Sequence, residues 1–435
     1  MEKRRIRVVW VTMLSNNELR KRLHLRRDIF DIYKKRSLES FILDYGKWNA
    51  NAINEFKKYD DLELHVISSH SKIASRLQEF THEGIHYHIY RPEQDYLSFR
   101  IRRKLIKGDY ETSEYRKNSK TITSIINRIN PDIVHYIGAE IPEYSSSALN
   151  IDPKFPLMVS LQTLMCDPDF KANYPISDKM YAYRSGVEVK VIKRADFVCC
   201  KSDHFKEIIW NTISPNIRIL DLALAVGENI TKATFKKEHT FIYFAKEIEK
   251  AADWAIEAFA IVNKRYPDTT LRIVGGYQTG YKRELDERLS ALGITERVTF
   301  TGSLPTHDDV INEVRKSTFA VLPLKIDLIA GTIREAMANG IPVVTTITPA
   351  TPELNEKRKS IMLSEKGDFN GMANNMMELI ENKTLAEQLQ ANAYETLKDR
   401  YDNETIAKQW HDSYFEVLEH MSNGTPISLE ATNRL

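Results

Sequence analysis

Two acidic residues in the second half of the chain are spaced as a polyhydroxyl ligand would require. Asp327 and Glu335 lie in the stretch DLIAGTIREAMANGIPVVTT, where a short helix is expected to start near Gly331 and to end at Asn-Gly-Ile-Pro. The preceding run, TFAVLPL, is typical of a buried strand, and ligands of parallel α/β sheets bind at the carboxyl ends of strands. We therefore expect a ligand site here, although two acids near a helix start could also simply offset the helix dipole.

Groups around this helix suit an anion. The N–H groups of Gly331, Thr332 and Ile333, together with the helix dipole, favour a phosphate or the polar face of a sugar. Lys246 and Lys250 lie at another strand-to-helix junction, TFIYFAKEIEKAADW, where two ammonium groups can pair with a diphosphate. Glutamates interleave with these lysines, so a solvated run of charges explains the same pattern.

Length and composition indicate a multidomain globular protein. At 435 residues the chain is longer than one hydrophobic core usually spans, so two or three domains are expected. A net charge of +2 argues against a dedicated nucleic-acid-binding protein. Three cysteines are too few for a disulfide framework, which favours a reducing, cytoplasmic setting. The apolar run near the N-terminus is too short for a signal peptide or a membrane span, and a first β-strand explains it.

Short apolar runs alternate with helix-period segments, which indicates a parallel α/β architecture. In DWAIEAFAIVNKRY, for example, Trp254, Ala258 and Val262 share one face with Ala255 and Phe259, as in a helix that lies on a sheet. Strands are predicted in two series, at 6–13, 62–68, 85–90, 132–137, 156–162 and 196–202, and at 240–245, 270–275, 297–302, 318–324, 341–346 and 360–364.

The two series predict two Rossmann-like, doubly wound parallel-sheet domains whose carboxyl edges face a cleft. The first domain is expected at 1–222, and a helix at 403–421 is expected to cross back onto it. A linker without clear periodicity, 223–239, leads to the second domain at 240–402, and the polar tail 422–435 is expected to be disordered.

The second half resembles the donor-binding domain of the retaining family-four glycosyltransferases (glycosyl transferases group 1), which have the GT-B fold. The matching stretches are FIYFAKEIEKAADWAIEAFAIVNKRYPDTTLRIVGG, VTFTGSL and AVLPLKIDLIAGTIREAMANGIPVVTT. The family signature is two glutamates separated by seven residues, ahead of an AMA-G-PVV segment. Glu335 stands at the second acid, whereas Asp327 replaces the first glutamate and lacks the glycine that usually follows it.

The resemblance implies a nucleotide-diphosphate sugar as donor substrate, with no cofactor and no metal. It implies that Glu335 holds the ribose, that Asp327 orients the transferred sugar, and that Lys250 binds the diphosphate. Lys246 stands where the family usually has arginine and would share that role. The catalytic candidates are therefore Asp327, Lys250 and Lys246, and the donor-binding candidates are Glu335, Gly331, Thr332, Ile333, Ser303 and Leu304.

The first half resembles the family's acceptor domain only loosely, through INPDIVHYIGAEIPEYSSSAL and FPLMVSLQTL. Gly138, Glu140 and Gln162 would lie at strand ends facing the cleft, as acceptor-side residues, although ordinary loop polarity explains them equally. The basic segment 18–36 could contact an anionic membrane or a pyrophosphate-linked lipid acceptor, and a solvated surface helix is its alternative interpretation.

No metal site is predicted. CDPDF (166–170) contains an Asp-x-Asp, but no second set of metal ligands accompanies it. The twelve histidines show no metal-ligand spacing, and His86 and His88 merely alternate on one strand face.

The predicted function is metal-independent, retaining hexosyl transfer from a nucleotide-diphosphate sugar to a hydroxyl of a glycan or lipid-linked glycan. The setting is cytoplasmic, including peripheral contact with the inner face of the membrane, and no nucleic-acid partner is expected. The alternatives are a nucleotide-sugar epimerase of similar fold and a non-catalytic nucleotide-sugar-binding protein. An epimerase would need further acids and a base in the first domain. The non-catalytic hypothesis is motivated by Asp327, which stands where the family has glutamate.

Overall fold

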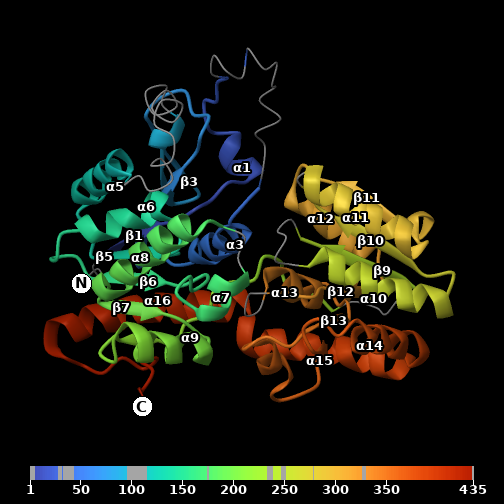
Figure 1. The fold of residues 1–435 in the computed structure, drawn as a ribbon. Helices are drawn as coiled ribbons and strands as arrows, with labels where there is room; N and C mark the ends of the chain where they lie inside the picture. Colours follow the sequence, from blue (N-terminus) through green and yellow to red (C-terminus); the bar gives the residue numbers. More distant parts are fainter. Residues whose placement is uncertain are drawn as a thin grey trace. The chain divides into compact units, whose positions relative to one another are not determined.

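The chain forms two units (Figure 1), of which the first comprises residues 1–171, 176–225 and 403–435 and the second residues 172–175 and 226–402. The computed structural model describes residues 5–27, 32, 44–95, 115–173, 176–232, 239–245, 251–277, 279–325 and 330–433. Within these ranges, no helix combines the length and the apolar character that crossing a bilayer requires.

The first unit is built on one eight-stranded sheet in the order β3-β4-β2-β1-β5-β6-β7-β8, in which only β3 runs antiparallel to its neighbour. Its central strands are almost entirely buried because helices cover a parallel sheet on both sides. The sequence predicts six of these strands and misses β3 and β8. The strands are β1 (Ile6–Val11), β2 (Leu62–Ser69), β3 (Leu77–His82), β4 (Ile85–Tyr90), β5 (Ile133–Ile137), β6 (Leu157–Ser160), β7 (Phe197–Cys199) and β8 (Ile219–Leu220).

Helices between these strands bury one apolar stripe each. In α5, Ile122, Ile125, Ile126 and Ile129 follow the three- and four-residue spacing of a helix face and are all buried. The helices are α1 (Asn17–Arg20), α3 (Lys47–Phe56), α5 (Arg116–Ile129), α6 (Pro142–Ser145), α7 (Pro168–Asn173), α8 (Asp178–Arg194) and α9 (Asp203–Ile208). Shorter turns are η2 (Glu93–Asp95), η4 (Ser146–Asn150) and η5 (Ile209–Ile213).

The second unit has a six-stranded, wholly parallel sheet in the order β11-β10-β9-β12-β13-β14. All six of its strands are predicted from the sequence, and the two parallel sheets confirm the predicted α/β fold class. The strands are β9 (Thr240–Phe244), β10 (Thr270–Val274), β11 (Val298–Gly302), β12 (Phe319–Val321), β13 (Val343–Thr346) and β14 (Met362–Ser364).

The helices of the second unit follow the expected periods. In α10, Ala255, Ala258, Phe259 and Val262 are buried as predicted, whereas Trp254 is only half-buried. The helices are α10 (Ala252–Arg265), α11 (Thr279–Leu292), α12 (His307–Arg315), α13 (Gly331–Ala338), α14 (Phe369–Glu381) and α15 (Lys383–Tyr401), with short turns η7 (Thr295–Arg297) and η8 (Thr351–Asn355).

The last helix, α16 (Asn403–Asn423), packs within the first unit. The hydroxyl of Tyr414 accepts a hydrogen bond from Trp10 Nε1 at 2.7 Å and lies 2.7 Å from His135 Nδ1. The other ring nitrogen of His135 lies 2.8 Å from Ser160 Oγ, and burial lowers the pKa of His135 to about 3. The imidazole is therefore neutral, and Tyr414 donates to it, so every polar atom of this buried group is paired.

The polar tail is ordered as far as the structure describes it, contrary to the prediction of disorder. The N–H of Asp221 donates to the carbonyl of Leu429 at 2.7 Å, and the N–H of Ala431 donates to the carbonyl of Ile219 at 2.8 Å. Ile427 is buried. The edge strand β8 thus gains a partner, which satisfies backbone groups that the edge of a sheet leaves unpaired.

The basic segment 18–36 does not begin as a surface helix. Of this segment the structure describes 18–27 and residue 32, and α1 ends at Arg20. Arg20 is buried and pairs with Asp44 at 2.7 Å, because Leu19 and Leu23 draw this stretch into the core. Of the described basic residues, Arg20 is thus buried, whereas Lys21, Arg22, Arg26 and Arg27 are exposed.

We predict that Tyr414→Phe destabilises the first unit. Loss of the hydroxyl leaves Trp10 Nε1 and His135 Nδ1 buried without their partner, which costs roughly 1–3 kcal/mol for each stranded group. Urea titration measures the loss in unfolding free energy. Tyr59→Phe is the matched control, since this half-buried hydroxyl makes no hydrogen bond to the described residues. Equal stability of the two variants would contradict the assignment.

Candidate functional site

The acid pair of the sequence is placed only in part. Glu335 lies in α13, which follows β12 at the carboxyl edge of the second sheet. Asp327 falls outside the described residues, and so do Lys246 and Lys250, which follow β9. The described part of the candidate donor site is therefore built around Glu335.

Glu335 lies in a tightly packed place. Its side chain is only 11% exposed, and its Oε1 lies 3.5 Å from His307 Nε2 at the start of α12. On the other side is the backbone of Gly227, where an added Cβ would stand 2.2 Å from the same Oε1. Only glycine at position 227 allows the carboxylate to take this position.

Charged groups hold the segment around Gly227 against α12, within the second unit. The carboxylate of Glu228 lies 3.7 Å from His307 Nε2 and 3.4 Å from Arg315 Nη2. Arg315 in turn donates from Nε to Asn339 Oδ1 at 2.8 Å, beside the end of α13. Sequence reasoning missed Gly227 and His307. For Gly227, the only signal in the sequence was its position beside Glu228 within the predicted linker.

The start of α13 offers backbone groups, but fewer than the sequence predicts. No side chain caps the helix, whose N-cap residue is Ala330. The N–H of Ile333 donates to the carbonyl of Ala330 at 3.1 Å and the Ile333 side chain is buried, so this amide is already paired, and its role in binding an anion stays a prediction. Gly331 is exposed and Thr332 half-buried, so these two residues are accessible to a ligand.

Ser303 and Leu304 directly follow β11, at the same edge of the sheet. A Cβ added at Gly276, just after β10, would stand 1.9 Å from Ser303 Oγ. The N–H of Gly275 donates to the carbonyl of Gly302 at 3.2 Å. Glycines thus let the ends of two neighbouring strands approach closely at the position of Ser303.

A lysine that the sequence analysis did not single out also lies at this edge. Lys325 follows β12 and pairs with Asp253 in the first turn of α10 at 3.0 Å. Its ammonium group lies 5.3 Å from the ring centre of Trp254. The signal available in the sequence was a lysine two residues before Asp327 at the end of a buried strand.

In the first unit, the three predicted acceptor-side residues come together. Gly138 has φ of 105°, and a Cβ added there would stand 2.9 Å from Gln162 Nε2 and 3.1 Å from Glu140 Oε2. Gln162 Nε2 also donates to the carbonyl of Ile137 at 2.8 Å. These residues follow β5 and β6, neighbouring strands of one parallel sheet. The order of strands therefore explains why they meet.

Glu140 is a buried carboxylate with capacity for a ligand. Among the described residues, no donor hydrogen-bonds to its Oε2, and burial raises its pKa. A second buried acid that the sequence reasoning missed, Glu188 on α8, accepts from the N–H groups of Met165 and Cys166 at 3.0 and 3.1 Å. Burial raises the pKa of Glu188 to about 8, and the nearby charge of Glu140 acts in the same direction.

A hollow of about 870 Å³ lies elsewhere in the first unit, among α5, η4 and α8. Its lining includes the basic residues Arg116, Lys120 and Lys190, and none of the predicted site residues. It therefore lies on the helical layer rather than at the strand ends that carry the predicted site.

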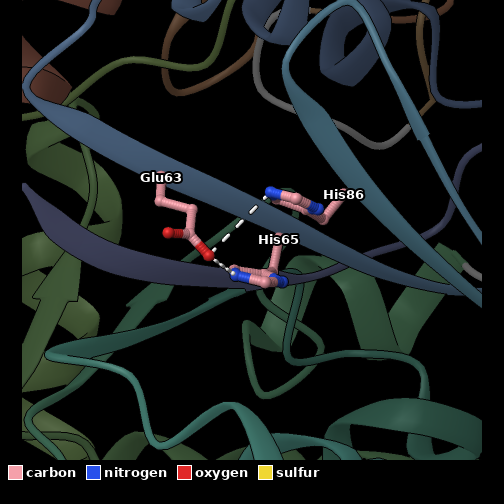
Figure 2. A group of neighbouring side chains, drawn as sticks. All are labelled: Glu63, His65 and His86. Carbon is pink, nitrogen blue, oxygen red and sulfur yellow. Dashed lines mark hydrogen bonds and ion pairs between the residues drawn. The ribbon is translucent and has the colours of Figure 1, made fainter.

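The Asp-x-Asp of the sequence has a structural place. Asp167 lies 2.8 Å from His204 Nε2 and accepts from the N–H of Asp169 at the start of α7. A different group in the described residues has metal-ligand spacing, namely Glu63, His65 and His86 on β2 and β4 (Figure 2).

Comparison with known proteins relates one segment of the chain to a family. Residues 238–382 match the family model described as Glycosyl transferases group 1. An uncharacterized glycosyltransferase of Haemophilus influenzae is 27% identical over 203 residues, which are 46% of this chain and 54% of that protein. The match thus spans about half the length of this curated relative.

Two solved structures share the fold over nearly the whole chain. Sucrose-phosphate synthase from Thermosynechococcus elongatus has a TM-score of 0.67 at 15% identity and covers 95% of this chain and 100% of its own. Anabaena HepE, in complex with UDP, has a TM-score of 0.62 at 15% identity and covers 94% of this chain and 100% of its own. The chain therefore has the GT-B fold, and its residues 238–382, which include Glu335, match the model of the glycosyl transferases group 1 family.

Proposed function

We propose that the protein is a retaining glycosyltransferase that moves a hexose from a nucleotide-diphosphate sugar to a hydroxyl of a glycan or lipid-linked glycan. The observation that carries the proposal is Glu335: a carboxylate at the carboxyl edge of a parallel sheet, fixed between Gly227 and His307, inside the segment that matches the family. Such a carboxylate can accept hydrogen bonds from both hydroxyls of a ribose.

The residues have distinct proposed roles. Glu335 binds the ribose, and Ser303 and Leu304 line the nucleotide side. Asp327 orients the sugar. Lys246, Lys250 and the backbone at Gly331 and Thr332 stabilise the diphosphate as its bond to the sugar breaks, which is the principal electrostatic task of the reaction. Transfer then needs no metal ion.

For the acceptor, we propose the group formed by Gly138, Glu140 and Gln162. The support is the buried Oε2 of Glu140, to which no described donor hydrogen-bonds. A sugar hydroxyl can supply that donor. Contact of segment 18–36 with an anionic membrane stays a prediction. The three cysteines, all described, form no disulfide, which supports the proposed cytoplasmic setting.

The direct test is product formation. Purified protein is incubated with nucleotide sugars, starting with UDP-sugars, and a panel of glycan and lipid-linked acceptors. Release of nucleoside diphosphate that depends on the acceptor, with the anomeric configuration of the product assigned by NMR, supports the proposal. Isomerised donor without acceptor would favour an epimerase. Donor binding without turnover on any acceptor would favour a non-catalytic protein.

We predict that Gly227→Ala lowers nucleotide affinity while the fold remains intact. The new methyl group meets only the end of the Glu335 side chain, so the carboxylate swings away from the ribose. Loss of a charged acceptor costs roughly 1.5–3 kcal/mol, or about 10- to 150-fold in Kd, and Glu335→Ala should show the same loss. Calorimetry with UDP and other nucleoside diphosphates measures it. Gly280→Ala, where a Cβ meets open space, is the control.

Lys250→Ala should reduce turnover more than donor affinity, because charge on the diphosphate grows as the glycosidic bond breaks. A loss of roughly 100- to 1,000-fold in kcat is expected for a group of this kind. Steady-state kinetics at saturating donor, with a chelator present throughout, measures it. The exposed Lys264, in the last turn of α10, provides the matched control Lys264→Ala. Normal turnover of the Lys250 variant would refute its role.

Asp327 is tested by two substitutions. Asp327→Asn keeps the shape but loses charge-assisted acceptance, so transfer should fall while nucleoside-diphosphate affinity stays. Asp327→Glu should lower activity or change donor preference if the loop has adapted to the shorter side chain. Higher activity of this variant on the same donor would instead mark Asp327 as a weakened form of the usual acid. Unchanged transfer in both variants would show that the residue does not contact the sugar.

A further inference from the structure

A cluster of three side chains in the first unit has the composition of a metal site. Glu63 and His65 alternate along β2 and so project from the same face, and the register pairs His65 directly with His86 on β4. One ligand atom from each residue lies within 4.8 Å of the others. Figure 2 shows Glu63 directed toward both rings. All three residues are near the amino ends of their strands, at the edge of the sheet opposite to the acceptor-side group.

We propose that Glu63, His65 and His86 bind a divalent metal ion of the zinc type. Glu63 Oε1 lies 2.8 Å from His65 Nε2 and 3.9 Å from His86 Nε2. Zinc bonds of about 2.0–2.1 Å in a tetrahedron separate two ligand atoms by roughly 3.3 Å. The two distances bracket this separation, so small side-chain rotations suffice.

The hydrogen-bond contacts of the neighbouring rings are compatible with a cation at this position. His65 Nδ1 lies 3.0 Å from His88 Nε2, and His88 Nδ1 contacts the carboxylate of Glu79. The row Glu63–His65–His88–Glu79 therefore has three contacts, each of which needs a proton, whereas two neutral imidazoles supply two. The third contact takes either a further proton or, in its place, a metal ion.

In this row, the contact between His88 Nδ1 and Glu79 contains a proton, which belongs to His88. Arg128 pairs with Glu79 and holds it as a carboxylate, so His88 donates to it from Nδ1. His88 Nε2 must then accept from His65 Nδ1, which leaves the lone pair of His65 Nε2 facing the carboxylate of Glu63. This pair of facing atoms is where a metal ion would be bound in place of a proton.

His86 completes the ligand set. Its Nδ1 lies 2.9 Å from Thr81 Oγ1, which can accept the Nδ1 proton and leave Nε2 as a lone pair. At 3.9 Å the contact of Nε2 with Glu63 is too long for a hydrogen bond. The rings of His65 and His86 stack with centres 4.6 Å apart, which places both rings beside Glu63. A small rotation of the half-buried His86 ring would direct its Nε2 at the ion. Both proposed ligand rings thus have a partner at their second nitrogen, as metal-bound histidines usually do.

The donor set selects the kind of ion. Two imidazoles and one carboxylate suit zinc and its neighbours in the first transition row rather than magnesium or calcium, which prefer oxygen ligands. The side chains of Glu63 and His86 are 31% and 36% exposed, so the ion can enter and keep a water molecule as fourth ligand. Because the site joins β2 to β4 and uses no donor-site residue, its expected role is to stabilise the sheet, apart from the proposed sugar transfer.

The test uses the full chain, stripped of metal with a chelator and titrated with Zn²⁺ by calorimetry. One high-affinity ion per chain is expected, with a rise in thermal unfolding temperature. His86→Gln should weaken binding by at least about 100-fold, and Glu79→Gln, which disturbs only the supporting row, by roughly 10- to 100-fold. His82→Gln, on neighbouring β3 and outside the cluster, is the matched control and should bind like the unmodified chain.

Co²⁺ provides a second measurement that does not depend on stability. Visible absorption of four-coordinate Co²⁺ should appear in the unmodified chain and in His82→Gln, and should be absent from Glu63→Gln and His86→Gln. Circular dichroism confirms that each variant is folded. Failure of the unmodified chain to bind one Zn²⁺, or equal affinity of the His86 and His82 variants, would overturn the proposal. Neither result bears on glycosyl transfer.

Discussion

Parallel pairing of strands is the constraint on which both units depend. Strands that run in one direction gather all loops of one kind at one edge, and helices have to cover both faces. For this reason β5 is buried along its whole length, and the described residues of the candidate donor site follow β11 and β12. The same constraint brings polar residues at the amino ends of neighbouring strands together at the opposite edge of the sheet. Glu63 and His65 meet His86 there because neighbouring strands start side by side.

The sequence predicts those parts of the fold that local periodicity encodes. Strands buried on both faces read as apolar runs, and α10 shows its buried stripe in the spacing of Ala255, Phe259 and Val262. The strand β3, LQEFTH, was missed because no residue in it is fully buried, so hydrophobicity gives no signal. The two-residue β8 and the tail beside it were missed for a different reason. Their order comes from hydrogen bonds between segments about two hundred residues apart, which no local window contains.

In the candidate site too, features encoded by consecutive residues could be predicted, whereas contacts between remote segments could not. Glu335 was predictable because its strand, loop and helix are consecutive in the chain. Gly227 and His307, which fix its carboxylate, come from remote segments and are recognised only by close approach in space. The histidines illustrate the limit most clearly. Sequence shows that His86 and His88 alternate on one face, but the partner of His86 is set by the register between β2 and β4, and only the folded sheet reveals it.

Burial affects the acids of the two units differently. Glu335 has His307 within 3.5 Å and the dipole of its own short helix, so its charge has nearby compensation. Glu140 lies in the core of its loop with one oxygen to which no described donor hydrogen-bonds, and burial raises its pKa because the ionised form loses water without gaining an equivalent partner. Hydroxyl donors of a sugar would restore that compensation and favour the carboxylate. If the proposed acceptor site is correct, binding of a polyhydroxyl acceptor at Gly138, Glu140 and Gln162 and ionisation of Glu140 are coupled, because the acceptor hydroxyls supply the donors that the buried carboxylate needs.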